Sequence, residues 1–146
     1  MQKNKILLDC TNHVAGRMLS KIVDIIKKDN KIQFYLINWH LAISTGSLKN
    51  AVKKYKYDSD HSTTTHGPYL PHSIRGIFWR KLRGMLPKNK IRKSEIKRNI
   101  ILLSPYEYLN IKNDKFNFEG KIAAESKKFG KNYTIQEYSR KINGQK

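Results

Sequence analysis

The chain has 146 residues, the length of about one domain, and its 30 lysines and arginines against 11 aspartates and glutamates give a formal net charge of +19. So much like charge destabilises a compact domain unless a polyanion neutralises it, so we expect a nucleic acid as the partner rather than a membrane surface. One cysteine excludes an internal disulfide and a zinc site built from cysteines, and the lack of a long apolar stretch excludes a membrane-spanning helix, so we expect a cytoplasmic protein.

The first part of the chain alternates between strand-like and helix-like patterns. Lys5–Cys10 is a short apolar run typical of a buried strand, and Thr11 or Asn12 can cap a helix after it. Val14–Asp29 places its apolar side chains on one half of a helical wheel, which predicts an amphipathic helix. Lys31–Asn38 is rich in aromatic and β-branched residues and predicts a second strand.

A second unit of the same kind follows. Leu41–Thr45 either extends the second strand or forms another, and Gly46 and Ser47 open a helix whose apolar face begins at Leu48. The order strand, helix, strand, helix predicts βαβ units and therefore a parallel sheet covered by helices. Residues 58–76 are expected to form an extended loop, because this stretch is polar, contains glycine and proline, and has no periodicity.

The next predicted helix combines an apolar face with a cationic one. Over Ile77–Leu86, the side chains of Phe78, Leu82, Met85 and Leu86 cluster on a helical wheel, with Trp79 at their edge. Arg80 and Arg83 point to the opposite side, next to Gly84, and Pro87 is expected to end the helix. The pattern predicts a helix that is fixed in the core by one face and presents two arginines around a shallow notch.

The rest of the chain is expected to complete a single domain spanning residues 1–146, of which 111–146 are a basic C-terminal portion. Thr134 and Glu137 have the spacing of a capping box, which predicts a last helix ending near Ile142. The other predicted elements are a helical turn at Ser94–Arg98, a strand at Asn99–Leu103 and a short helix at Gly120–Phe129.

The segment from Gly76 to Ser94 holds seven basic residues and no acidic one, and Arg75 precedes it. Eight phosphate contacts would make nucleic-acid binding steeply dependent on salt. Arginine suits this role because its planar fork binds phosphate oxygens and also stacks on bases. The alternative is an ordinary solvated basic face.

The same region carries a resemblance to a known family. His66–Lys90, HGPYLPHSIRGIFWRKLRGMLPKNK, resembles the signature region of the large-subunit ribosomal protein thirteen family, in its archaeal and eukaryotic branch. LDCTNHVAGRMLSKIV, INWHLAISTGSLKNAVKKY and FNFEGKIAAESKKFGKNY resemble other parts of that family in the same order. The resemblance implies an α/β fold with three α/β/α layers and a four-stranded, mainly parallel sheet. It also implies a non-enzymatic protein that binds large-subunit rRNA, contacts neighbouring ribosomal proteins and supports subunit assembly and translation.

The expected site combines basic residues, a helix start and a loop. Arg17 lies at the start of the first helix, where free amides attract anions, although a tight turn with a surface arginine explains it equally well. Tyr69 can stack on a base or pin its loop to the core. The residues expected to bind rRNA are Arg17, His66, Tyr69, His72, Arg75, Arg80, Lys81, Arg83, Gly84, Lys88, Lys90, Arg92 and Lys93.

Other chemistry is less well supported by the residue spacings. His61, His66 and His72 with Cys10 fit no standard zinc pattern, so we expect no metal and no other cofactor. Cys10 and His13 do not make a convincing nucleophile pair. Two alternatives stay open: a free-standing RNA- or DNA-binding regulator, and a small α/β enzyme acting on a phosphorylated substrate at the edge of its sheet.

Overall fold

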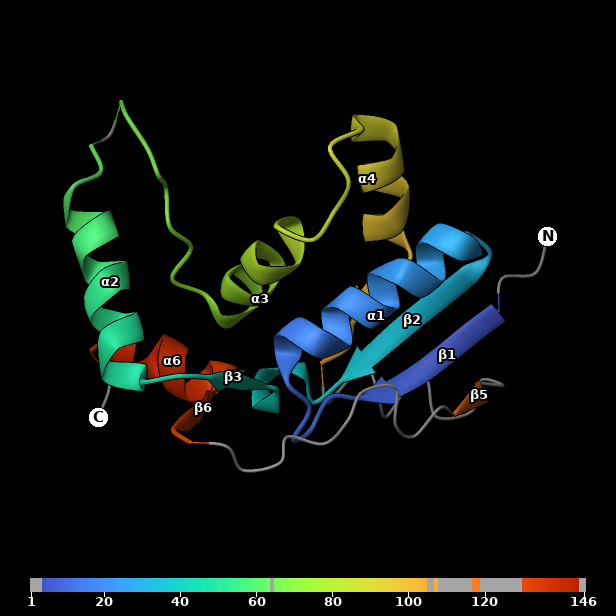
Figure 1. The fold of residues 1–146 in the computed structure, drawn as a ribbon, viewed down its shortest axis with the longest axis horizontal. Coiled ribbons are helices and arrows are strands. Elements are labelled where there is room, and N and C mark those ends of the chain that lie inside the picture. The colour runs from blue at the N-terminus through green and yellow to red at the C-terminus, as the bar shows by residue number, and fades with distance from the viewer. Residues whose placement is uncertain (1–3, 64, 105–106, 108–116, 119–129, 145–146) are drawn as a thin grey trace.

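Two parallel strands, β1 (Asn4–Asp9) and β2 (Ile32–Ile37), form the centre of a sheet and are connected by α1 (Ala15–Lys28), as Figure 1 shows. The computed structural model describes residues 4–63, 65–104, 107, 117–118 and 130–144. β4 (Ile100–Leu102) pairs in parallel with β2, and β5 (Asn117–Phe118) pairs in parallel with β1, so the strand order is β4-β2-β1-β5. The predicted α/β class with a parallel sheet is confirmed, while the short helix predicted at Gly120–Phe129 lies outside the described residues.

The main hydrophobic core lies between one face of this sheet and α1. Leu8 in β1 is opposite Leu36 in β2, and both side chains are fully buried. Met18 and Ile22 of α1 belong to the same cluster, as the amphipathic pattern of this helix predicted. Burying a side chain of this size stabilises the fold by about 1.5–3 kcal/mol. The opposite face of the sheet carries a second, smaller cluster around Leu7, and the two clusters leave these strands little polar surface.

The turn after β1 is held by Asp9 rather than by a helix cap. The Asp9 carboxylate accepts hydrogen bonds from the Thr11 backbone amide at 3.0 Å, from the Thr11 hydroxyl at 2.7 Å and from the side-chain amide of Asn38 at 3.2 Å. Burial alone would raise the pKa of Asp9, but these hydrogen bonds outweigh it and lower the pKa. The prediction that Thr11 or Asn12 caps α1 is wrong: Thr11 binds Asp9, Asn12 has a φ of 61°, and Val14 is the N-cap without a side-chain hydrogen bond.

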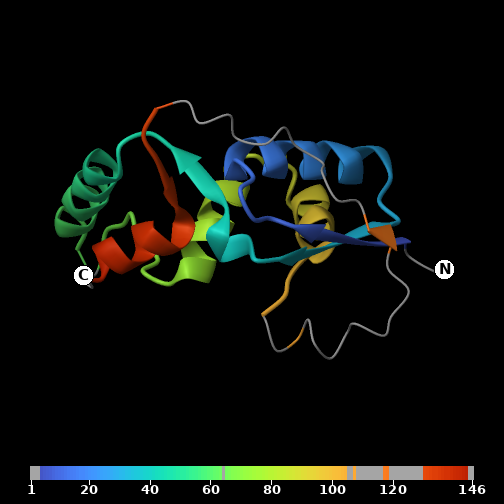
Figure 2. The same ribbon diagram turned by 90° about the horizontal axis from the view of Figure 1, so that it is seen from below.

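A second, two-stranded sheet lies beside the first (Figure 2). β3 (Ile43–Thr45) pairs antiparallel with β6 (Asn132–Thr134), a strand that sequence analysis did not predict. A turn of 3-10 helix at Trp39–Leu41 separates β2 from β3, so Leu41–Thr45 starts a new strand instead of extending the previous one. The final helix, α6 (Ile135–Ile142), follows β6 directly and ends where the capping-box pattern predicted.

Three further helices differ from their predicted bounds. α2 (Leu48–Asp60) and α3 (Ile74–Arg83) both extend into the predicted loop of residues 58–76, so its described part is residues 61–63 and 65–73, named the loop 61–73 below. α3 starts earlier than predicted because the Ser73 hydroxyl accepts a hydrogen bond from the Gly76 amide at 3.1 Å. It also ends earlier, at Arg83 with Gly84 as the C-cap, so the prediction that the helix continues to Leu86 and is ended by Pro87 is wrong. α4 (Lys90–Arg98) is longer than the single predicted turn. None of the helices among the described residues is long and apolar enough to cross a membrane.

The capping box of α6 provides a stability test. The Glu137 amide donates to the Thr134 hydroxyl at 3.1 Å, and the Thr134 amide donates to the Glu137 carboxylate at 2.9 Å. We expect Thr134→Ala to lower the free energy of unfolding by about 1 kcal/mol, measured by denaturant unfolding. Ser47→Ala is the matched control, because Ser47 is the N-cap of α2 but makes no side-chain cap bond. Equal losses in both variants would contradict the role of the box.

Candidate nucleic-acid interface

The arginine-bearing helix α3 stands between two other segments of the chain. In Figure 1, α2 and the loop 61–73 rise on one side of α3, and α4 rises on the other. α4 begins at Lys90 because the Asn89 side-chain carbonyl accepts from the Ile91 amide at 2.9 Å and from the Arg92 amide at 3.5 Å. The basic residues that line the surface between these segments come from α3 and α4, whereas the loop contributes no lysine or arginine.

The apolar face of α3 fixes this helix to the domain. Ile77, Phe78 and Leu82 are buried, and the ring of Phe78 meets Trp39 edge to face, with centroids 5.7 Å apart. Trp79, Met85 and Leu86 are partly buried and pack against the same core. The prediction that Phe78 and Leu82 anchor the helix is confirmed, and the opposite side of the helix remains available to a partner.

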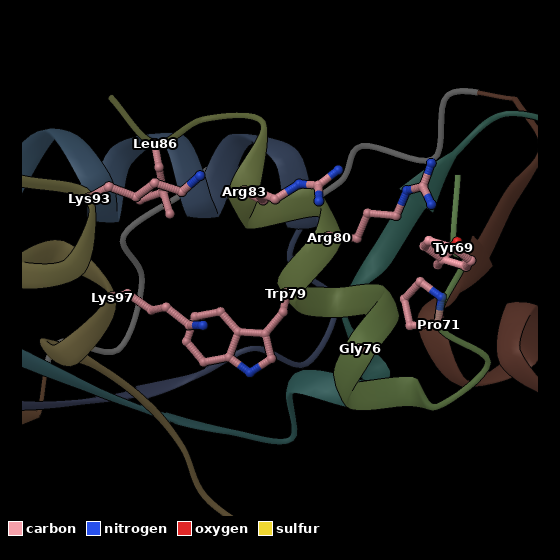
Figure 3. Close-up of a pocket in the computed structure, with 9 residues that line it drawn as sticks. All are labelled: Tyr69, Pro71, Gly76, Trp79, Arg80, Arg83, Leu86, Lys93 and Lys97. Atoms are coloured by element: carbon pink, nitrogen blue, oxygen red, sulfur yellow. The ribbon is translucent and has the colours of Figure 1, made fainter. Parts of the chain in front are cut away.

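A hollow of about 500 Å³ opens over the outer face of α3 (Figure 3). α3 contributes Gly76, Trp79, Arg80 and Arg83, while α4 contributes Lys93 and Lys97; Leu86 comes from the turn between the two helices, and Tyr69 and Pro71 come from the loop. None of the lining residues in the described part of the chain is acidic. A hollow lined by four cations and by apolar and aromatic side chains suits an anionic ligand with a flat apolar part.

The cations around the hollow have no acidic partners within the described residues. Arg83 is exposed, and Arg80 and Lys93 are half-buried. No ion pair joins any of these three, or Lys97, to an acidic side chain among the residues that the structure describes. Like charges gathered on one concave surface raise the local positive potential and attract polyanions. The structure thus brings together Arg80, Arg83, Lys93 and Tyr69 from the predicted set.

Among the lining residues that sequence analysis did not assign to the site, Lys97 and Trp79 bear most directly on ligand binding. The Lys97 ammonium lies 5.3 Å from the centroid of the Trp79 ring, close enough for a cation–π interaction. Lys97 follows Lys93 by one helical turn, so recognising α4 over its full length would have identified it. Trp79 was placed only at the edge of the apolar face, yet Figure 3 shows its indole projecting from α3 toward Lys97.

The loop 61–73 is held at its second half. The Tyr55 hydroxyl donates to the Pro71 carbonyl, and the Ser139 hydroxyl donates to the His72 carbonyl at 3.2 Å. The His72 side chain is exposed, with its ring against Tyr55, and His66 is exposed in the turn at the other end of the loop. Tyr69 is 67% exposed and lines the hollow, which favours its predicted role in stacking over a role in pinning the loop.

The other predicted contacts lie around this hollow or beyond its rim. Arg75 is exposed in the first turn of α3. Lys88, Lys90 and Arg92 are exposed in the turn before α4 and in its first turns. Arg17 is exposed in the first turn of α1, and a Cβ on the adjacent Gly16 would lie 4.0 Å from Met85, just after α3. These cations can extend the contact with a large polyanion beyond the hollow.

Lys81 differs from the rest of the predicted set. Its ammonium donates to the Ser44 hydroxyl at 2.8 Å and lies in a second hollow, of about 350 Å³, lined by α2, α3, Tyr133 and Tyr138. Burial lowers the pKa of Lys81. Burial, and the neighbouring Tyr133 and Tyr55, raise the pKa of Tyr138 to about 12. The structure therefore places Lys81 in a second hollow, which shares Arg80 with the hollow over α3 but does not include Arg83.

Cys10, His13 and the possible metal ligands were considered above for nucleophilic or metal chemistry, and the structure shows their surroundings. Cys10 is fully buried, and this burial raises the pKa of its thiol, so the thiolate needed of a nucleophile is disfavoured. The ring of His13 is buried and its Nδ1 lies 3.0 Å from the Thr11 carbonyl. Among the described residues, no three His, Cys, Asp or Glu side chains are grouped closely enough to hold a metal ion.

The fold and this surface define a basic α/β protein with a concave cationic face of the kind that binds nucleic acid. The sequence profile of the family described as Ribosomal protein L13 matches residues 3–101. The chain is 31% identical to the large ribosomal subunit protein uL13 of Sulfolobus acidocaldarius, over 99% of this chain and 97% of that protein. The uL13 of Sulfurisphaera tokodaii is 27% identical, over 99% of this chain and 98% of the relative.

A third relative matches a shorter region. The uL13 of Archaeoglobus fulgidus is 33% identical over 81 residues, and the match spans 56% of this chain and about half, 51%, of that protein. The family match and the full-length relatives agree with the resemblance seen in the sequence. The chain belongs to the ribosomal protein L13 family.

Gly76 in the first turn of α3 and Gly84, the C-cap of this helix, differ in the space around them. A Cβ on Gly76 would lie 2.5 Å from the Cβ of Pro71, because the loop crosses the helix there. We expect Gly76→Ala to lower the free energy of unfolding by about 1–3 kcal/mol, measured by denaturant unfolding. Gly84→Ala is the control: its Cβ would meet nothing nearer than the Lys81 carbonyl oxygen at 3.8 Å, and we expect a change within about 0.5 kcal/mol. A stable Gly76→Ala protein would contradict this close packing.

Proposed function

We propose that this protein is a structural, non-enzymatic constituent of the large ribosomal subunit that binds and stabilises folded rRNA. The observation that carries the proposal is the concave face over α3, where Arg80, Arg83, Lys93 and Lys97 gather without an acidic partner among the described residues. Membership of the ribosomal protein L13 family supports the same function, since the relatives are named large ribosomal subunit proteins.

The proposed binding mode is a clamp on RNA backbones. The α/β core is the rigid platform, and α3 is fixed to it by Phe78 and Leu82. The arginines of α3 and the lysines of α4 bind phosphates from neighbouring rRNA segments, while the loop 61–73 follows the RNA on the other side. Double-stranded RNA is read mainly by its shape and its phosphate and 2′-hydroxyl groups, so this surface recognises folded rRNA rather than a base sequence.

Neighbouring ribosomal proteins are the second class of partner in this proposal. Tyr57 on α2 is 62% exposed and Ile91 on α4 is 72% exposed, and both lie away from the core. Exposed apolar side chains of this size are suited to protein contacts at the edges of an RNA-binding surface. By holding rRNA segments and adjacent proteins together, the domain supports assembly of the subunit and, through it, translation.

Incorporation into ribosomes tests the function and the site together. We expect Arg80→Glu with Arg83→Glu to reduce the fraction of the protein that sediments with large subunits, because two attractive contacts with phosphate become repulsive. Lys49→Glu with Lys53→Glu is the charge-matched control, since both lysines are exposed on α2, outside the hollow. Circular dichroism checks that both variants stay folded. An equal loss of incorporation in both variants would mean that net charge, and not the α3 surface, determines incorporation. Wild-type protein that does not sediment with large subunits would overturn the proposed function.

The salt dependence of RNA binding tests which lysines and arginines touch phosphate. The exposed Arg83 is expected to bind a phosphate, so Arg83→Gln should reduce the slope of log affinity against log salt by about 1. Lys81→Gln should leave this slope unchanged, because the Lys81 ammonium is bound to Ser44 in the other hollow. The measurement is a titration with a fragment of large-subunit rRNA at several salt concentrations. A reduced slope in Lys81→Gln would show that Lys81 turns outward to the RNA.

A further inference from the structure

We propose that the hollow over α3 takes one unpaired nucleotide of the RNA, with the base against Trp79 and the flanking phosphates on the cations of α3 and α4. This inference rests on the proposed function and adds the class of ligand that the hollow recognises. A clamp on phosphates needs only an exposed set of cations. The structure has in addition a recess with apolar walls. The polar sugar–phosphate backbone would gain nothing from contact with such walls, whereas a base would.

The lining of the hollow matches a nucleotide in both its parts. Trp79, Leu86 and Pro71 provide apolar surface, and Tyr69 stands at the rim, 67% exposed. Its volume, about 500 Å³, falls in the range of roughly 300–1,000 Å³ that small-molecule pockets occupy. The flanking backbone of a paired RNA strand lies on the outside of a helix, with its bases stacked inside. Only a nucleotide that has left the stack can place its base in this recess.

The two tryptophans differ in whether the indole is used within the fold: Trp39 is, and Trp79 lines the hollow. The Trp39 indole donates to the Leu103 carbonyl at 3.0 Å and packs on Phe78, so its polar atom is used within the fold. The indole nitrogen of Trp79 has no hydrogen-bond partner among the residues that the structure describes. The half-buried Trp79 therefore offers a ring face and a free donor to a base.

Lys97 places a charge where base and phosphate meet. Its ammonium lies 5.3 Å from the Trp79 ring centroid, at the end of a long flexible side chain. A base that stacks on this ring displaces the ammonium, which can then bind a phosphate or an acceptor atom of the base. Arg80 and Arg83 come from α3 on one side of the hollow, and Lys93 and Lys97 come from α4 on the other (Figure 3). A nucleotide within a chain has phosphates on both sides, and this arrangement of cations matches them.

The test uses Trp79 as its own reporter. The chain has two tryptophans, so Trp39→Phe leaves Trp79 as the single indole. The probes are two single-stranded RNAs of about five nucleotides, one of adenosines and one with abasic sites throughout, which carry the same number of phosphates. We expect the adenosine RNA to quench Trp79 fluorescence and to bind about 5- to 150-fold more tightly than the abasic RNA, the range typical of one stacked base.

Matched variants separate base stacking from phosphate binding. In full-length protein that retains Trp39, Trp79→Leu keeps an apolar side chain against the core and should abolish the difference in affinity between the two RNAs. Arg83→Gln should weaken binding of both RNAs and keep the difference. Equal affinities and no quenching of Trp79 with either RNA would overturn the nucleotide pocket but leave the phosphate clamp intact. Failure to bind either RNA, together with absence from large subunits, would overturn the proposed function itself.

Discussion

The structure depends on how α3 is held between an apolar core and a set of unneutralised cations. One face of this helix buries Phe78 and Leu82, and the other presents Arg80 and Arg83. Burial of the apolar face supplies the free energy that keeps mutually repelling cations in one place. Because α3 is already packed on the core, its backbone does not have to be ordered when a polyanion binds, and this lowers the entropic cost of binding. The ten-residue helix α3 therefore both packs on the core and carries the arginines of the proposed binding surface.

The combination of aromatic and cationic side chains over α3 indicates more than electrostatic attraction. A uniformly charged surface binds any polyanion and distinguishes little among RNA shapes. The recess between α3, α4 and the loop adds a steric requirement, since only a nucleotide outside a stacked helix reaches Trp79. Folded rRNA contains such nucleotides in its loops and bulges, whereas a regular duplex does not. The proposed pocket would thus let a largely shape-reading protein favour one folded region over another.

The site was only partly predictable, because the positions of α3 and α4 determine which basic side chains line the hollow. Charge density along the chain identified Arg80, Arg83 and Lys93, and all three line the hollow. Lys97 was overlooked because the cationic segment was ended at Ser94, whereas the Asn89 cap starts α4 at Lys90 and so puts Lys93 and Lys97 on one helix. Lys81 was grouped with its neighbours, but its hydrogen bond to Ser44 joins residues far apart in the sequence. Local patterns do not encode such long-range contacts.

By itself, the sequence determined the α/β class, the amphipathic α1, the capping box of α6 and the cationic segment around α3. Each of these follows from interactions between residues a few positions apart, so periodicity and composition suffice to reveal them. The tertiary structure alone decided that Leu41–Thr45 contains a separate strand paired with β6, that Lys81 binds Ser44 in a second hollow, and that the Lys97 ammonium lies over the Trp79 ring. These features come from packing between distant segments, where the competition for burial and hydrogen-bond partners is settled only once the whole chain has folded.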